Sequence, residues 1–274
     1  MAQVVRKSSR ISVAARSAAA LALIVALGMP SGARAGEAEA KALLKAMSDY
    51  LAAQNTISLT YDANFEVVTK DHQKLLLANS GAIDLSRPNK IHATRSGGFA
   101  DVDLVFDGKT LTILGKEGEV NVYVQTEAPG TIYQLVDDLR DKYHKPVPGA
   151  DLLLPNVYDE LMRDVVDVKD LGSGVIGGTE CDHLAFRTKD LDWQIWIAQG
   201  ERPRPCRYVI TSAQADQAPQ YSIQITGWKT GDQAVPGDFS SKAPAGAKKI
   251  DVNELKAMKG LNELPSNFMT GEGQ

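Results

Sequence analysis

The chain has 274 residues, of which 43% are hydrophobic and 23% are charged, and its formal net charge is −4. It contains no long basic run of the kind that binds nucleic acid or anionic lipid. Composition and charge therefore argue against a nucleic-acid-binding protein and against electrostatic docking on a membrane surface.

Residues 1–35 have the pattern of a secretory signal peptide. Basic residues precede a short apolar run at residues 18–29, and the sequence Ala-Arg-Ala that ends at Ala35 matches a cleavage site. The apolar run is shorter than the roughly 20 residues that cross a bilayer. Gly36, rather than a lipid-accepting cysteine, follows the cleavage site. We expect cleavage near Ala35 and a soluble periplasmic protein that does not span the membrane.

The exported part is long enough for one large β-rich domain. Residues 1–35 hold five basic residues and no acidic ones, so residues 36–274 carry 25 Lys and Arg against 34 Asp and Glu, a formal charge of −9. No repeat, low-complexity tract or dividing linker interrupts this part. We therefore predict a single domain over residues 36–274.

The first half begins with a predicted helix and continues as a series of predicted strands. In residues 37–54, apolar side chains recur every three or four residues, which is typical of an amphipathic helix. The spacing then changes to period two, and Asp107-Gly108 is a strong hairpin turn. The predicted strands are residues 57–67, 74–85, 91–95, 101–106, 109–115 and 119–126.

A helical segment is predicted in the middle of the chain. Thr131 precedes an amphipathic pattern that runs to residue 142, where prolines follow, and Asn156 precedes a second helical pattern at residues 157–165. From its position alone, this insertion is interpreted as a cover or lid over the sheet.

Strands return in the second half. The predicted strands are residues 175–187, 191–198, 206–213 and 221–228, and Gly177-Gly178 is interpreted as a bulge or kink within the first of them. Asp251 and Glu254 have the spacing of a capping box, which indicates a short helix in the tail.

The segment "ECDHLAFR" places Cys181, Asp182 and His183 side by side. Neighbouring side chains of a strand point to opposite faces, so Asp182 cannot join the other two in a hydrogen-bonded relay. We therefore expect no catalytic residues and no enzyme. A thiol-dependent enzyme that uses Cys181 is the alternative.

The same segment is a candidate for metal binding and for a disulfide. Cys181, His183 and Cys206 would make an incomplete zinc site, and the other histidines are isolated, so no metal and no cofactor are expected. In a simple meander, strand 191–198 separates the cysteines by about 9.5 Å. A bridge needs Cα atoms within about 7 Å. A bridge is therefore not favoured unless a bulge, a bend or another strand order brings the cysteines together.

The apolar side chains of "DLDWQIWIAQ" suggest a sheet that is covered on both faces. Trp193, Ile195 and Ile197 share one face, and Trp196 points to the other. Packed core is one interpretation, and the lining of a concave apolar pocket is the other. The candidate ligand-binding residues are Trp193, Ile195, Ile197, Trp196, Phe186, Ile132 and Leu135.

Three segments resemble a family of predicted periplasmic proteins, DUF2092. They are "DGKTLTIL", "PGTIYQLVDDL" and "GGTECDHLAFRTKDLDWQIWIAQGERPRPCRYVIT", and the resemblance spans nearly the whole exported chain. That family is similar to the LolA/LolB lipoprotein carriers and to RseB. The resemblance implies a LolA-like, α+β fold: an incomplete antiparallel β-barrel whose N-terminal helix and mid-chain helical insertion cover the apolar concave face. Known carriers use an apolar cavity and a positioned arginine.

These observations favour a periplasmic binding protein. Its expected partner is a lipid, an acyl chain or a lipoprotein, held in an apolar half-barrel cavity as in lipoprotein transport. The alternative is a cell-envelope regulatory or assembly module that binds another protein.

Overall fold

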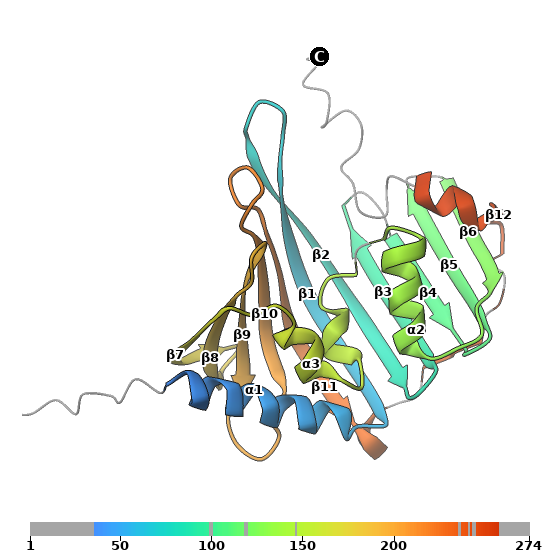
Figure 1. Cartoon of the computed structure of the whole chain (residues 1–274). Helices are drawn as coiled ribbons and strands as arrows, with labels where there is room; N and C mark the ends of the chain where they lie inside the picture. The colour runs from blue at the N-terminus through green and yellow to red at the C-terminus, as the bar shows by residue number, and fades with distance from the viewer. Residues whose placement is uncertain are drawn as a thin grey trace, which may run out of the picture. The chain divides into compact units, whose positions relative to one another are not determined.

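The computed structural model describes residues 36–98, 101–117, 120–145, 147–234, 237–240, 242 and 245–257. The predicted signal peptide lies outside these residues. The described part of the chain forms one twelve-stranded sheet with helices on its concave side (Figure 1). The strands before the helices are β1 (Thr56–Val68), β2 (Lys74–Ser86), β3 (Lys90–Gly97), β4 (Asp101–Phe106), β5 (Thr110–Glu117) and β6 (Val120–Glu127). The later strands are β7 (Asp167–Ile176), β8 (Thr179–Arg187), β9 (Leu191–Ala198), β10 (Pro205–Ser212), β11 (Gln220–Thr230) and β12 (Lys248–Lys249).

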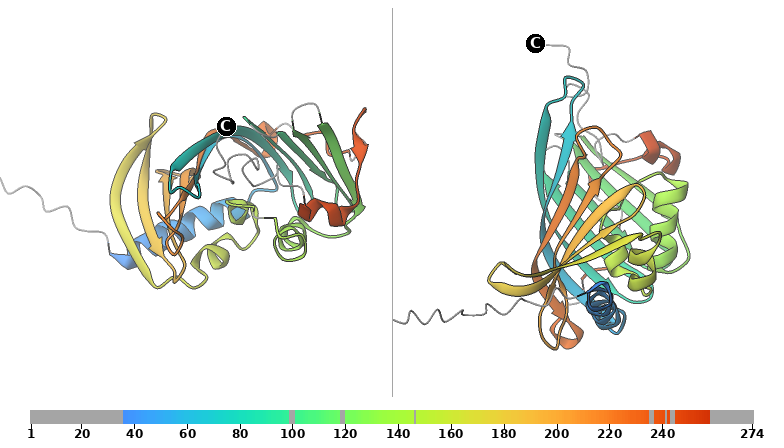
Figure 2. Two further views of the ribbon diagram at one scale, coloured as in Figure 1. Left: turned by 90° about the horizontal axis from the view of Figure 1, so that it is seen from above. Right: turned by 60° about the vertical axis from the view of Figure 1, so that its left-hand side comes forward.

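Two antiparallel meanders meet at one strand pair. The sheet order is β12-β6-β5-β4-β3-β2-β1-β11-β10-β9-β8-β7, and only β12 pairs in parallel. β1 pairs with β11 from Ile57 opposite Thr230 to Phe65 opposite Tyr221. Because β12 and β7 do not pair with each other, the barrel remains open, and Figure 2 shows the resulting arch. The predicted curved antiparallel sheet is therefore confirmed.

The helices lie beneath this arch. They are α1 (Glu37–Ala52), α2 (Ile132–Asp137), which continues as the π-helical η1 (Asp138–Lys142), the 3₁₀ helix η2 (Ala150–Leu153) and α3 (Val157–Met162). The predicted apolar stripe of α1 is buried, and this helix packs on α3, β7 and β9. No helix in the described ranges has the length and apolar character needed to cross a bilayer.

The Gly177-Gly178 pair is a hairpin turn, so the prediction of one strand over residues 175–187 is wrong. These glycines have φ of +55° and +80° and join β7 to β8. Positive φ at two central residues is the geometry of a tight hairpin turn. β7 was missed because Gly172 and Gly174 interrupt its alternation of apolar and polar side chains.

Asn156 directly precedes α3, as the second helical pattern predicted. Asn156 is the N-cap of α3, but its side chain accepts no hydrogen bond from the helix backbone. Its Nδ2 instead donates to Glu160 Oε1 at 2.8 Å. In the tail, residues 252–257 form a 3₁₀ helix, η4 (Val252–Ala257), near the predicted short helix.

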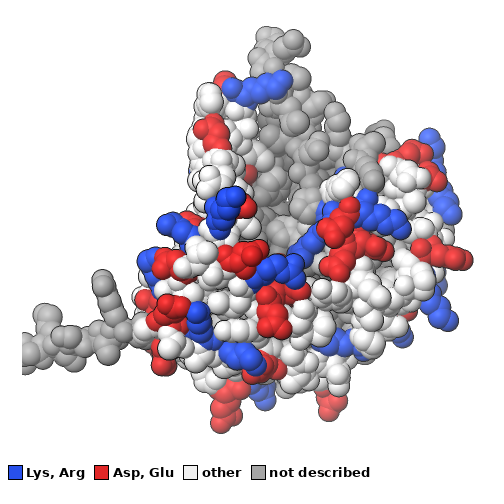
Figure 3. Space-filling view, in the orientation of Figure 1, with Lys and Arg blue, Asp and Glu red and all other residues white. Residues whose placement is uncertain are grey.

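Charged side chains are mixed on the face shown in Figure 3. Lys and Arg side chains are interspersed there with Asp and Glu, and apolar or neutral residues lie between them. This face therefore presents no large patch of a single sign.

Candidate functional site

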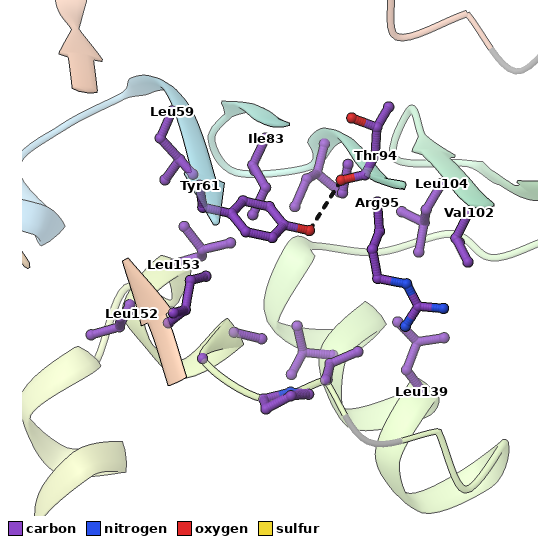
Figure 4. A pocket seen from close by; sticks show the side chains of 18 of the residues that line it. Leu59, Tyr61, Ile83, Thr94, Arg95, Val102, Leu104, Leu139, Leu152 and Leu153 are labelled. Carbon is purple, nitrogen blue, oxygen red and sulfur yellow. Dashed lines mark hydrogen bonds between the residues drawn. The ribbon is translucent and has the colours of Figure 1, made fainter. Parts of the chain in front are cut away.

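A cavity of about 400 Å³ lies between the concave face of the sheet and the helical segment 132–153. The sheet contributes mainly apolar side chains from β1 to β5 and from β11, including Leu59, Ile83, Val102, Leu104, Ile113 and Ile225. The helical segment supplies the opposite wall, including Ile132, Leu135, Val136, Leu139, Leu152 and Leu153 (Figure 4).

Helical spacing directs the apolar residues of α2 and η1 into this wall. Residues 132, 135, 136 and 139 recur at intervals of three and four, and all four are buried. Thr131 fixes the start of α2 with a capping box, because Gln134 N donates to the Thr131 hydroxyl and Thr131 N donates to Gln134 Oε1 at 2.8 Å. Ile132 N also donates to Pro88 O at 2.9 Å, which ties α2 to the turn between β2 and β3.

Tyr61 is one of the few polar side chains in the cavity wall. Its hydroxyl donates to the backbone oxygen of Thr94 on β3 at 3.1 Å (Figure 4). Burial raises the pKa of the Tyr61 phenol, so it remains a neutral donor. A Cβ atom at Gly81 would lie 2.5 Å from the Tyr61 hydroxyl, so the glycine on the intervening strand β2 gives the ring its space.

Arg95 places a positive charge at this otherwise apolar site. Its side chain extends from β3 toward Leu139 in the helical wall (Figure 4). Burial lowers the pKa of the Arg95 guanidinium, and the nearby phenols of Tyr61 and Tyr221 and the carboxylate of Asp101 act in the opposite direction. Within the described part of the chain, Arg95 forms no salt bridge with a carboxylate. Its donors are therefore available to an anionic or polar group.

Asn79 adds an unpaired acceptor to the same wall. The residue is 9% exposed, and its Oδ1 has no hydrogen-bond partner among the described residues. Most buried polar atoms are paired, because leaving one unpaired costs free energy. The Asn79 oxygen is thus suited to accept a hydrogen bond from a ligand or from a water molecule that accompanies it.

The structure brings only part of the predicted site together. Ile132 and Leu135 line the cavity. The other five residues lie outside the lining of this cavity. Trp193, Ile195, Ile197 and Phe186 are buried in the core where α1 packs near β9, and Trp196 faces the other side of the sheet, where it stacks on His183.

The polar residues of the cavity were missed from the sequence. Tyr61, Asn79 and Arg95 lie on three strands that the alternation of side chains predicted correctly. The alternation of side chains along each strand indicated which residues share a face with Leu59, Ile83 and Ile91. It did not indicate that the helical insertion covers this half of the sheet rather than the half with the tryptophans.

Cys181 and His183 do not form the pair that a thiol enzyme would need. His183 Nε2 lies 2.9 Å from Gln194 Oε1, whereas Cys181 Sγ lies 2.8 Å from Cys206 Sγ. Burial and the neighbouring Cys206 raise the pKa of the Cys181 thiol to about 12, so the thiol is protonated at neutral pH. The described residues also contain no group of three or more potential metal ligands.

The irregularity that a cysteine bridge was expected to need is present, and both cysteines are free thiols in the structure. β9 does lie between β8 and β10, as expected, but the register of β10 shifts at Cys206 between Pro205 and Arg207. This irregularity brings the two sulfur atoms close together despite the intervening strand.

Comparison with known proteins assigns the chain to a family. Residues 40–253 match the family described as "Predicted periplasmic protein (DUF2092)", and the chain belongs to it. The resemblance seen in the sequence is thus confirmed. The search of curated proteins gave no significant match.

Several solved structures are similar to the chain. The Mycobacterium tuberculosis lipoprotein LppX has a TM-score of 0.44 and 11% identity, over 73% of this chain and 100% of LppX. The Pseudomonas aeruginosa MucA/MucB complex has a TM-score of 0.41 and 14% identity, over 76% of this chain and 62% of the matched chain. The LolA superfamily protein NE2245 of Nitrosomonas europaea has a TM-score of 0.28 and 12% identity, over 74% of this chain and 97% of NE2245. At these identities the function must be argued from the cavity itself.

Proposed function

We propose that this protein is a non-enzymatic periplasmic binding protein, exported by a signal peptide cleaved near Ala35, that holds the apolar chain of a lipid or a lipidated protein. The observation that carries the proposal is the cavity of about 400 Å³ between the sheet and segment 132–153. Its volume lies within the roughly 300–1,000 Å³ range of small-molecule sites, and its walls are mainly apolar.

The binding energy would come from removal of the acyl chain from water. Each buried methylene contributes about 0.8 kcal/mol, so a long chain recovers the free energy lost in ordering ligand and protein. An apolar wall discriminates poorly between chains of similar length. Selectivity would therefore depend on the polar end of the ligand.

Arg95 and Asn79 supply the polar contacts of the proposed complex. The Arg95 guanidinium would donate to a carboxylate, phosphate or ester oxygen, and Asn79 would pair with a hydroxyl or amide of the ligand. Both residues lie in the cavity wall, on β3 and β2. The ligand would thus be an amphiphile whose polar group lies among these strands.

The helical segment would open to admit the ligand. It is anchored at its start by the capping box at Thr131 and within itself by an ion pair in which Arg140 Nη2 lies 2.9 Å from Asp151 Oδ1. Hydrogen bonds from Ile132 N to Pro88 O and from Arg87 to Leu153 O tie the segment to its surroundings. None of these contacts pairs two strands, so the wall can separate from the sheet without breaking strand pairs.

Mass spectrometry of the protein as it is isolated from the periplasm tests the proposal directly. We expect an organic extract of the folded protein to contain an acyl-chain lipid in an amount comparable to the protein. An extract free of lipid, together with no binding of a fluorescent fatty acid to the protein, would contradict the proposal.

A matched pair of variants locates the binding site. Ala93→Phe places a ring in the cavity and should weaken fatty-acid binding strongly, because Ala93 lines the wall on β3. Ala78→Phe adds the same ring on the exposed side of β2 and should leave binding unchanged. Equal affinities for the two variants would show that the ligand does not enter this cavity.

The same experiments separate the proposal from its alternative. An envelope assembly module would retain its protein partner after delipidation and in the Ala93→Phe variant. Partner capture that survives both treatments, in a protein without bound lipid, would favour the alternative.

A further inference from the structure

Two buried thiols meet at one end of strands β8, β9 and β10. Cys181 on β8 is 0% exposed, Cys206 on β10 is 2% exposed, and their sulfur atoms lie 2.8 Å apart. These are all the cysteines of the chain. The contact joins two strands that are not neighbours, because β9 lies between them.

The backbone explains how the sulfur atoms meet across an intervening strand. Cys181 lies opposite Ala198, the last residue of β9. Along β10, Pro205 pairs with Ile197 and Arg207 pairs with Trp196, which leaves Cys206 as an extra residue at the irregularity. An extra residue of this kind changes the direction in which its side chain points. The small Ala198 side chain, in contact with both cysteines, leaves room between them.

This cluster is separate from the ligand cavity. The cysteines pack with Ala198, Trp196 and Ile176, whereas the main core holds Trp193, Ile195 and Ile197. Side chains alternate along β9, so the two sets lie on opposite faces of the sheet. A change at the cysteines therefore leaves the cavity wall in place.

We propose that Cys181 and Cys206 form a structural disulfide in the exported protein, made by thiol–disulfide exchange with a disulfide-bearing protein oxidant. Exported proteins meet an oxidising environment in which such bridges persist. Both sulfur atoms are shielded from solvent in the fold, so the bond would resist reduction once the strands have closed.

The exchange proceeds in two steps that balance. The Cys206 thiolate attacks one sulfur of the oxidant's disulfide, forms a mixed disulfide and releases the oxidant's other sulfur as a thiolate. The Cys181 thiol then gives its proton to water, attacks Cys206 Sγ and releases the second oxidant thiolate. Two electrons pass to the oxidant, whose disulfide becomes a dithiol, and the chain loses two hydrogen atoms.

The surroundings of the thiols indicate when this chemistry occurs. Arg204 Nη1 lies 3.9 Å from Cys206 Sγ, the sulfur that attacks first. Burial raises the pKa of Cys181 in the folded chain. The exchange would therefore take place during folding, before Trp196 and Ile176 cover the pair.

Intact-mass analysis of protein isolated from the periplasm tests the proposal. Thiols are alkylated in denaturant before any reductant is added. We expect no alkylation, a mass lower by two hydrogen atoms than that of the reduced chain, and a proteolytic peptide pair joined through Cys181 and Cys206. Alkylation of both cysteines without reduction would overturn the proposal.

Melting temperatures give a second, independent test. If the bridge exists, Cys181→Ala, Cys206→Ala and the double variant should each lose a similar number of degrees, because either change removes the same bond. Wild-type protein that is reduced in denaturant and refolded in reductant should melt at a lower temperature than the oxidised protein, whereas the same treatment should not change the double variant. Additive losses, or a wild type whose melting temperature is unchanged by this treatment, would also overturn the proposal.

Discussion

Arg95 carries a charge into a cavity whose walls are mainly apolar. Partial burial of a guanidinium costs free energy, and among the described residues Asp101 acts on it only from a distance, without a salt bridge. A ligand with an anionic group would compensate for this cost. The proposed function therefore predicts that Arg95 binds the anionic group of the ligand.

We expect Arg95→Met to weaken binding of a fatty acid much more than binding of the fatty alcohol of the same length. A hydrogen bond to a charged group contributes about 1.5–3 kcal/mol, which corresponds to about a ten- to hundredfold change in affinity. Isothermal titration with both ligands measures the difference. Arg95→Lys is the control, because it keeps the charge and should keep part of the preference.

His183 gives the stability of the sheet a pH dependence. The ring stacks on Trp196 at 3.9 Å between centroids, and burial lowers the pKa of the imidazole below its ordinary value of 6.5. As the pH falls below about 6.5, the unfolded chain protonates this imidazole more readily than the folded protein does. The free energy of unfolding is therefore highest above the unfolded pKa and decreases as the pH falls.

His183→Gln should therefore flatten the decline in urea midpoint between about pH 7.5 and pH 5. The exposed His144 provides the comparison, since His144→Asn leaves the stacked ring intact and should keep the wild-type decline. An unchanged pH profile in His183→Gln would show that other groups cause the decline.

At the scale of elements, Arg87 ties together the end of α1 and the helical segment over the cavity. Its guanidinium donates to Gln54 O at 2.9 Å, to Leu153 O at 2.7 Å and to Leu51 O at 3.4 Å. Carbonyl groups at a helix end lack partners within the helix. One side chain thus satisfies oxygen atoms from two elements and fixes their relative position.

Arg87→Met should lower the free energy of unfolding by about 2–4 kcal/mol, because it leaves buried carbonyl oxygens unpaired. It should also speed ligand release, since Leu153 belongs to the cavity wall. Urea denaturation and stopped-flow release of a fluorescent fatty acid measure the two effects.

Lys45→Met is the matched control for this change. The Lys45 side chain is 52% exposed and pairs at the surface of α1 with Asp49, whose side chain is 64% exposed. Such pairs contribute about 0–1 kcal/mol. If both variants lost similar stability, the hydrogen bonds of Arg87 would not be what fixes the helical segment.

At the scale of the whole molecule, local patterns predicted the elements well. The alternation of apolar and polar side chains located β1 to β6 and β9 to β11 within a few residues, because each strand has one side that faces the core. The helix at residues 37–54 and the start of a helix after Thr131 were also evident, since both depend on neighbours within one turn. The resemblance to the family, rather than any pattern, indicated an open barrel.

Long-range contacts decided what the sequence left open. The pairing of β1 with β11 joins residues such as Leu59 and Trp228, and it sets which strands form the cavity floor. No local pattern encodes that pairing. A single extra residue at Cys206 likewise changed the cysteine geometry, and one-residue irregularities are not visible in the alternation of side chains.

Hydrogen exchange should reveal which half of the sheet holds the ligand. A ligand that binds only the folded state lowers the population of open states around its site. We expect fatty acid added to delipidated protein to slow exchange in segment 132–153 and in β3 and β4, which line the cavity. The hairpin of β7 and β8 should change little, because α1 rather than the cavity packs near this end of the sheet. Protection centred on β8 and β9 would return the binding site to Trp193 and its neighbours, as the sequence first suggested.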